Sequence, residues 1–193
     1  MKKFYRYFLM TVLALCLSIP AIAAEAATVV LVPLINNVQG DEIANQIFYK
    51  NAITAINAQQ GYTIVDNDKV TEIIESNKNG NNVPSEAALK KIAKDANVDI
   101  VIAIQLDELH DEPVFPSVER MVKLTISGRA VAYNALANKF YQHKIYSDKE
   151  MDETLTSRWD WVHEEWGYAV RHEINRILQV KKITVDAPRM SKL

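Results

Sequence analysis

The sequence predicts an α/β fold, on the border of α+β, in which helices cover a mixed sheet as a two-layer or three-layer sandwich. Two apolar, β-branched runs, Thr28–Ile35 and Val98–Ile104, are typical of strands buried on both faces of a sheet. Segments with helical spacing lie between them, and strict alternation follows from Val118 to Tyr133. The expected element order is β-α-β-α-α-β-β-β-α, with a carboxy-terminal antiparallel hairpin and a packing helix.

The first 23 residues have the pattern of a secretory signal peptide. Three basic residues precede an apolar run from Phe8 to Leu17, and Pro20 and a small-residue triplet ending at Ala23 follow. A transmembrane anchor needs about 20 apolar residues, and Pro20 interrupts this run early. We therefore expect cleavage near Ala23, export to the periplasm or the medium, and no stable membrane insertion after cleavage.

Cys16 is the only cysteine, and it lies inside the signal peptide. A lipoprotein signal needs a small residue where Leu15 stands, so we expect no lipid anchor. Without Cys16 the exported chain has no disulfide, no catalytic thiolate and no cysteine-ligated metal. Residues 24–182 are expected to form a single domain, and residues 183–193 a carboxy-terminal tail.

The exported chain is acidic. The sequence contains 24 acidic and 22 basic residues, and three of the basic residues lie in the signal peptide. A net negative domain lacks the electrostatic footprint that nucleic acid or anionic lipid requires. We therefore expect no nucleic-acid partner.

The first half of the domain is predicted to be a βαβ unit. Pro33 removes a ladder donor from the first strand, so the strand must bulge or stop pairing there. A helix is expected over Asp41–Gln60, because apolar residues recur on one broad side and Gly61 follows. Tyr62–Val65 then forms a short strand, which a right-handed crossover places parallel to the first.

Two helices and the central strand come next. A short helix capped by Asp66 or Asn67 precedes an exposed polar loop, Ser76–Pro84. Ser85 begins a second helix, which leads to the strand Val98–Ile104. Because this strand is apolar almost throughout, we expect it at the centre of the sheet.

The carboxy-terminal third predicts a hairpin and a final helix. The alternating strand that ends at Tyr133 is expected to be covered on one face and wet on the other. The turn Asn134–Asn138 returns the chain to an antiparallel partner, Lys139–Tyr146. The final helix is expected from about Trp159 to Val180.

Element order and local sequence resemble one superfamily of bacterial envelope domains. It includes the curli secretion lipoprotein, the lipoprotein activator of penicillin-binding proteins and the amino-terminal domain of the Tol-Pal component TolB. The segments that carry the resemblance are Val32–Asn36, Tyr62–Asp66, Ala93–Ile102 and the closing hairpin and helix. The resemblance implies a periplasmic interaction domain that is not an enzyme. The hairpin departs from the curli channel by its polar residues, so we expect no pore.

The sequence contains no recognised catalytic motif. Neither a glycine-rich phosphate loop nor a serine nucleophile elbow occurs in the sequence. His163-Glu164 begins a zincin motif, but Gly167 stands where the second histidine belongs. His163 and His172 are nine residues apart, which places them on opposite faces of a helix. We therefore expect no catalytic residue, no metal site and no cofactor.

The final helix carries the candidate partner-binding residues. Trp161 and Tyr168 are seven residues apart and point together, beside Glu165 and His172, away from the face expected to cover the sheet. Exposed aromatic side chains of this kind are enriched at interfaces. The alternative is internal packing, with the tail or the loop 112–117 folded over them.

A second candidate is the segment His110, Asp111 and Glu112, predicted to be a polar loop that leaves the central strand. Ligands collect at strand ends in α/β folds, so a ligand-binding role is one interpretation, and a solvated connector is the other. The acidic string formed by Asp148, Glu150, Asp152 and Glu153 is expected to be an exposed connector.

These observations together predict a non-enzymatic periplasmic or secreted protein of the bacterial cell envelope. Its expected role is binding or assembly, with an envelope protein or a second copy as the partner. The alternative is a small-ligand or glycan-binding domain that uses the strand-end loops near His110 and Asn77–Asn82. A hydrolase built on acidic residues is a third hypothesis, for which no carboxylate pair can be placed in one pocket from the sequence.

Overall fold

A computed structural model describes residues 26–39, 41–66, 68, 70–114, 121–152 and 158–178, with the exception of the Trp159 side chain. The predicted signal peptide and its cleavage site lie outside the described residues, as do the expected tail 183–193 and most of the connection after Pro113. In the described part of the chain, no helix has the length and apolar character needed to span a membrane.

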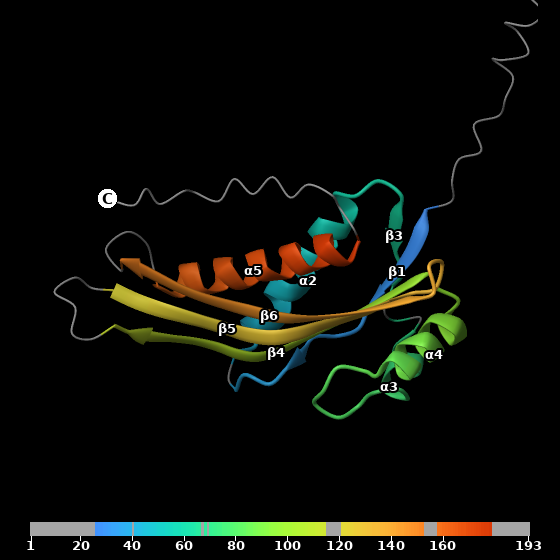
Figure 1. Ribbon diagram of the computed structural model, residues 1–193, viewed down its shortest axis with the longest axis horizontal. Helices are drawn as coiled ribbons and strands as arrows, with labels where there is room; N and C mark the ends of the chain where they lie inside the picture. Colours follow the sequence, from blue (N-terminus) through green and yellow to red (C-terminus); the bar gives the residue numbers. More distant parts are fainter. Residues whose placement is uncertain are drawn as a thin grey trace, which may run out of the picture.

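One mixed sheet organises the described chain (Figure 1). Its strand order is β3-β1-β4-β5-β6, and β2 pairs with β4 beyond the end of β1. The strands are β1 (Ala27–Leu31), β2 (Ile35–Asn36), β3 (Tyr62–Ile64), β4 (Ile100–Pro113), β5 (Met121–Asn134) and β6 (Lys139–Asp152). The predicted element order is confirmed, with β2 as an addition, and β4 is central as expected.

The amino-terminal strands form the parallel half of the sheet. β1 pairs in parallel with both β3 and β4, and β2 pairs in parallel with β4 at Gln105 and Leu106. The chain leaves the ladder between β1 and β2, where Pro33 has no N–H to donate. The break predicted at Pro33 is therefore confirmed.

Three 14-residue strands, β4, β5 and β6, form the antiparallel half. β5 and β6 pair without interruption. β4 and β5 shift register between Leu106 and Glu108, so Asp107 has no opposite residue and forms a β-bulge. Gly128 of β5 lies at this bulge, and a Cβ there would approach the Gln105 carbonyl oxygen to 2.2 Å.

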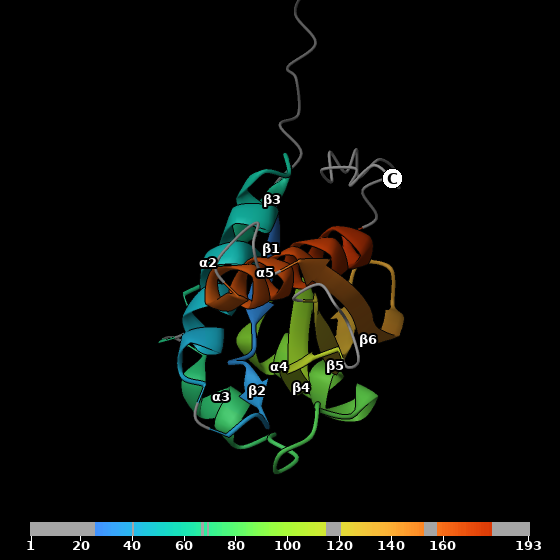
Figure 2. The same ribbon diagram turned by 90° about the vertical axis from the view of Figure 1, so that its left-hand side faces the viewer.

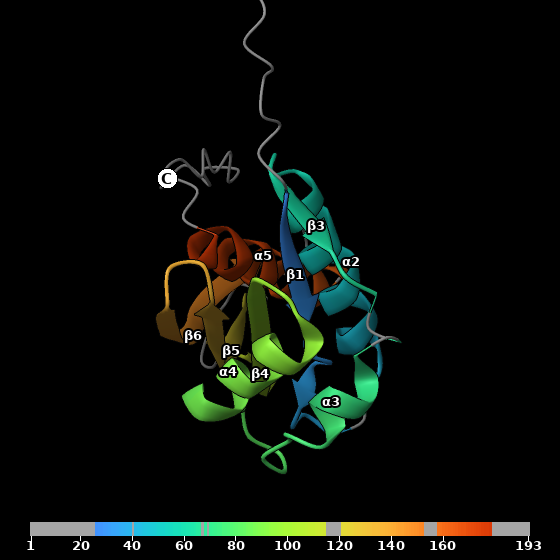
Figure 3. The same ribbon diagram turned by 90° about the vertical axis from the view of Figure 1, so that its right-hand side faces the viewer.

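Helices cover both faces of the sheet (Figures 1 and 3). On one face lie α2 and α5, which pack against each other (Figure 2). On the other face lie α3 and α4, over the end of the sheet where the parallel strands are. Their bounds are α2 (Ile43–Asn57), α3 (Thr71–Glu75), α4 (Glu86–Ala96) and α5 (Arg158–Ile177). The architecture is thus a three-layer sandwich at one end and two layers at the other.

Two apolar clusters hold the layers together. The larger one joins α2 and α5 to the sheet, and Trp166, fully buried, donates its indole N–H to the Ala44 carbonyl at 3.1 Å. The smaller one joins α3 and α4 to the opposite face. The predicted inner face of the last helix is confirmed for its described side chains, Val162, Trp166, Val170, Ile174 and Ile177. In addition, Ser85 caps α4 as predicted, because its hydroxyl accepts from the Ala88 amide.

Two sequence-based boundaries were wrong in the antiparallel half. His110, Asp111 and Glu112 do not form a loop but continue β4 as far as Pro113. Asp148 and Asp152 likewise belong to β6, which extends well past Tyr146. In both cases the partner strand continues to supply hydrogen bonds, so pairing persists through residues that are too polar to be recognised as strand.

Candidate functional site

A groove runs between helix α5 and strand β6, along the edge of the sheet that β6 forms. It encloses about 300 Å³. Helix α5 lines it with Glu165, Tyr168, Ala169, His172, Glu173 and Arg176, and β6 with Lys144, Ile145, Tyr146, Ser147 and Lys149. Three of the four predicted partner-binding residues, Glu165, Tyr168 and His172, therefore share one surface. We call it the α5–β6 groove.

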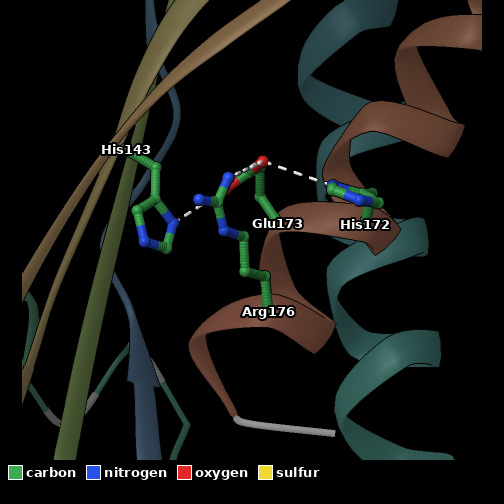
Figure 4. Close-up of polar contacts among 4 residues, drawn as sticks. All are labelled: His143, His172, Glu173 and Arg176. Atoms are coloured by element: carbon green, nitrogen blue, oxygen red, sulfur yellow. Dashed lines mark hydrogen bonds and ion pairs between the residues drawn. The ribbon is translucent and has the colours of Figure 1, made fainter. Parts of the chain in front are cut away.

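Glu173 anchors the inner wall of this groove (Figure 4). Its side chain is buried, and its Oε2 lies 3.1 Å from Nδ1 of His143 on β6. Its Oε1 lies 3.3 Å from Nδ1 of His172 and 3.8 Å from Nη1 of Arg176. A buried carboxylate is tolerated only with such partners, so this cluster ties α5 to the edge strand and orients His172.

Tyr168 forms the aromatic centre of the groove. Its ring stacks on the His172 ring at a centroid distance of 6.5 Å and an interplanar angle of 29°. Lys149 of β6 places its Nζ 5.2 Å from the centroid of the Tyr168 ring and also pairs with Glu165. A tyrosine held between a cation and an imidazole presents its remaining surface in one orientation, which favours binding because little side-chain entropy is left to lose.

Trp161 does not belong to this groove. It is partly buried and packs against the larger apolar cluster. Tyr168 is also only partly buried. Of the two interpretations, internal packing therefore applies to Trp161, whereas Tyr168 lines the groove. The two coverings proposed in the alternative, the tail and residues 115–117, lie outside the described residues.

The strand position of His110, Asp111 and Glu112 separates their side chains. His110 and Glu112 lie on the face of the sheet opposite α5, which we call the open face, with His110 Nε2 and Glu112 Oε2 3.7 Å apart. Asp111 points to the opposite face, where it pairs with Arg158 of α5. Arg158 also donates from Nη2 to the Asp111 carbonyl at 3.0 Å. The structure therefore does not bring the three predicted ligand-loop residues together.

The open face carries paired charges from all three long strands. Next to His110 and Glu112, Lys123 of β5 lies 3.2 Å from Asp148 of β6. The hydrogen bond to Asp148 raises the pKa of Lys123 above its ordinary value. From Lys123 to Arg129 this face of β5 is solvated and polar, as the alternation predicted, whereas Val131 and Tyr133 farther along the same face are buried in the smaller cluster.

A polar cavity of about 680 Å³ follows the carboxyl end of β2. Its lining consists of Asn36, Asn37, Val38, Gln39, Asn81, Asn82, Gln105, Asp107 and Arg129. Asp107, the bulge residue, accepts hydrogen bonds from Asn37 Nδ2 at 2.9 Å and from the buried Gln105. Gln105 Oε1 also accepts from the Val83 amide at 2.8 Å, which fixes the neighbouring loop. The bulge thus aims a carboxylate into a preorganised, amide-rich cavity.

His163 lies apart from both surfaces. It is buried, with its Nε2 3.6 Å from Oδ2 of Asp41, whose Oδ1 accepts from the Ala44 amide at the start of α2. His172 lies in the α5–β6 groove, so the two histidines occupy opposite sides of α5 as predicted. Within the described residues, no three histidine or carboxylate side chains gather as a metal site would require.

Comparison with known proteins finds similarity only at the level of structure. No protein-family model matches the chain, and no curated protein sequence is similar to it. The solved structures that it resembles include the hypothetical protein CT253 from Chlamydia trachomatis, with 10% identity, a TM-score of 0.49, and coverage of 79% of this chain and 94% of that one.

Bacterial lipoproteins are also among these structures. Lipoprotein GNA1162 from Neisseria meningitidis is 16% identical, with a TM-score of 0.42 over 79% of this chain and 98% of that one. The LpoB carboxy-terminal domain from Salmonella enterica is 10% identical, with a TM-score of 0.38 over 67% of this chain and 87% of that one. At these identities the likeness concerns the fold alone.

Proposed function

We propose that this chain is a non-enzymatic binding or assembly protein of the bacterial cell envelope, and that the α5–β6 groove is its partner-binding surface. The observation that carries the proposal is the gathering of Glu165, Tyr168 and His172 beside an open strand edge. The groove combines an aromatic centre with charged side chains around it, as protein interfaces combine an aromatic core with a polar rim. The signal-peptide pattern of the first 23 residues supports export of the chain.

The test separates binding from folding. The variant Tyr168→Ala removes the aromatic centre of the groove and should abolish partner capture from an envelope extract. Because Tyr168 is partly exposed, the midpoint of thermal unfolding should change little. Leu136→Ala is the matched control, since Leu136 is 70% exposed in the β5–β6 turn, away from the groove.

Trp161→Ala should behave in the opposite way. Its side chain packs on the apolar cluster, so the variant should unfold at a lower temperature through lost burial. The proposal fails if Tyr168→Ala captures the same proteins as the wild type. It also fails if Tyr168→Ala lowers the unfolding temperature as much as Trp161→Ala does, because Tyr168 would then be a packing residue.

A second candidate function is binding of a neutral glycan in the polar cavity at the Asp107 bulge. The observation that favours it is the combination of six amide side chains with Asp107 and the exposed Arg129, since hydroxyl-rich ligands need both donors and acceptors. N-acetylglucosamine and glucose tetrasaccharides are suitable probes. One of them should raise the unfolding temperature of the wild type but not of Arg129→Ala, and equal behaviour of both proteins would exclude this cavity.

A further inference from the structure

Strand β6 leaves one side of the sheet open. Within the described residues the only strand that pairs with it is β5, and all 14 of its residues pair without a register shift. The strand contains neither proline nor glycine. In an antiparallel strand every second residue directs its N–H and C=O away from the existing partner. The outer side of β6 is therefore a regular row of hydrogen-bonding groups that can accept another strand.

The charges along β6 are unevenly distributed. On its open face, Lys144 occupies the first half, and Asp148, Glu150 and Asp152 occupy the second half. Lys144 places its Nζ 5.5 Å from the centroid of the Tyr146 ring, and neither Lys144 nor Glu150 has an ionic partner in the described part of the chain. Asp148, by contrast, already pairs with Lys123. The open edge thus offers one unpaired cation and one unpaired anion.

We propose that this edge binds a second copy of the chain, β6 against β6 in antiparallel orientation, about a two-fold axis at Ser147. In this register Lys144 lies opposite Glu150 of the second copy, and two-fold symmetry makes this ion pair twice. Tyr146 then lies opposite Asp148, and Gln142 opposite Asp152. The inference rests on the proposed function, since self-association is one form of the binding role.

Other alignments of the two strands are less complementary. A parallel arrangement in register places Lys144 beside Lys144 and Glu150 beside Glu150. An antiparallel arrangement centred on Tyr146 places Lys144 opposite Asp148, which already pairs with Lys123, and leaves Glu150 opposite the uncharged Gln142. In the Ser147 register, no like-charged residues lie opposite each other between Gln142 and Asp152. Like charges directly opposite destabilise a strand pair, so the charge pattern selects this register.

The same register joins the two α5–β6 grooves. Antiparallel extension of a sheet preserves its faces, so α5 of both copies lies on the same face of the joined sheet. Tyr168 and His172, which line the side of α5 next to β6, then face the seam from each copy. The predicted partner-binding residues therefore border the proposed interface.

Charge reversal tests the register in the chain without its signal peptide. By analytical ultracentrifugation the wild type should be a dimer, and Lys144→Glu and Glu150→Lys should each weaken dimerisation at least about tenfold, because each creates two like-charged pairs. An equimolar mixture of the two variants should form a heterodimer with two ion pairs, because one chain carries an acidic residue at both positions and the other a basic residue at both. Lys91→Glu on the surface of α4 is the control for net charge and should dimerise as the wild type does.

A single cysteine tests the position of the axis. The exported chain has no other cysteine once Cys16 is removed, so Ser147→Cys can cross-link only to its own copy. Opposite Cα atoms of an antiparallel pair lie about 4.5–5.5 Å apart, which a disulfide can bridge. Mild oxidation should give a covalent dimer for Ser147→Cys and none for Gln142→Cys, whose two copies lie about 30 Å apart in this register.

The outcomes distinguish this inference from the proposed function. The proposed β6 interface is overturned if the wild type stays monomeric. It is also overturned if both charge-reversal variants dimerise as strongly as the wild type. If such a monomer still captures an envelope protein that Tyr168→Ala does not capture, the binding role stands without self-association. If the chain neither dimerises nor captures a protein, both fail.

Discussion

Replacing Gly128 by alanine tests the geometry of the bulge that shapes the polar cavity. Gly128 lies in β5 opposite Leu106, at the last regular pair before the extra residue Asp107. A Cβ at position 128 would lie 2.2 Å from the carbonyl oxygen of Gln105, 3.3 Å from its carbonyl carbon and 3.4 Å from the Cα of Leu106. All three atoms belong to the backbone of β4.

The expected cost follows from that distance. A carbon normally approaches a carbonyl oxygen to about 3.3 Å, so the two strands must separate locally by about 1 Å. A backbone oxygen in the middle of a sheet cannot rotate away as a side chain can. Overpacking usually costs about 1–3 kcal/mol, and we expect Gly128→Ala at the upper end of that range. For a domain of this size, about 3 kcal/mol lowers the unfolding midpoint by about 6–12 °C.

Gly167→Ala is the matched comparison. A Cβ at position 167 would lie 2.7 Å from Asn51 Nδ2, which belongs to a side chain that can move. Alanine also has a higher helix propensity than glycine by about 1 kcal/mol, which offsets part of the crowding. Urea unfolding followed by circular dichroism gives both free energies of unfolding. The reasoning is refuted if Gly128→Ala lowers the free energy of unfolding less than Gly167→Ala does. It is also refuted if the free energy of unfolding of Gly128→Ala lies within about 0.5 kcal/mol of the wild-type value.

Three further substitutions have effects that urea unfolding can measure. Glu173→Gln should lower the free energy of unfolding by about 1–3 kcal/mol, because it removes the buried carboxylate that contacts His143. The control Glu164→Gln, on the exposed side of α5, should change the free energy of unfolding by less than about 0.5 kcal/mol. Ser85→Ala should cost about 1 kcal/mol through loss of the α4 cap, and an unchanged stability would contradict that role. Asp99→Ala should cost about 2–3 kcal/mol, since its Oδ2 accepts from both the amide and the hydroxyl of Thr28 at 2.8 Å, and a loss below about 1 kcal/mol would show that these bonds are dispensable.

The sequence predicted the elements whose own residues determine them. β1 and the first part of β4 are apolar on both faces, and a strand with two apolar faces has to be covered on both sides. Pro33 predicted a break because a missing N–H is a property of that residue alone. The inner face of α5 was predictable because its apolar residues recur at helical spacing.

The features that the sequence did not predict depend on neighbouring elements. The alternation in β4 changes phase at Asp107: Ile104 and Leu106 face α5 before the bulge, and Leu109 and Asp111 face it after the bulge. Only the pairing with β5 and the missing side chain of Gly128 create that change. The candidate ligand segment at His110 could therefore not be assigned to the correct face from its own residues.

Trp161 shows the same dependence for a helix. Trp161 and Tyr168 are seven residues apart and lie on the same side of α5, so helical spacing alone could not distinguish their surroundings. Trp161 packs against the apolar cluster that α2, α5 and the sheet form together. Tyr168 lines the groove beside β6.

The two candidate surfaces can be separated by experiment. Tyr168 borders the proposed β6 seam from both copies, so Tyr168→Ala should weaken dimerisation as well as partner capture. Arg129 lies in β5, one strand in from the edge, and lines the polar cavity instead. Arg129→Ala should therefore leave the sedimentation coefficient unchanged while it removes any saccharide-induced stabilisation. If Arg129→Ala dissociates the dimer and Tyr168→Ala does not, the interface lies on the open face of the sheet rather than along its edge.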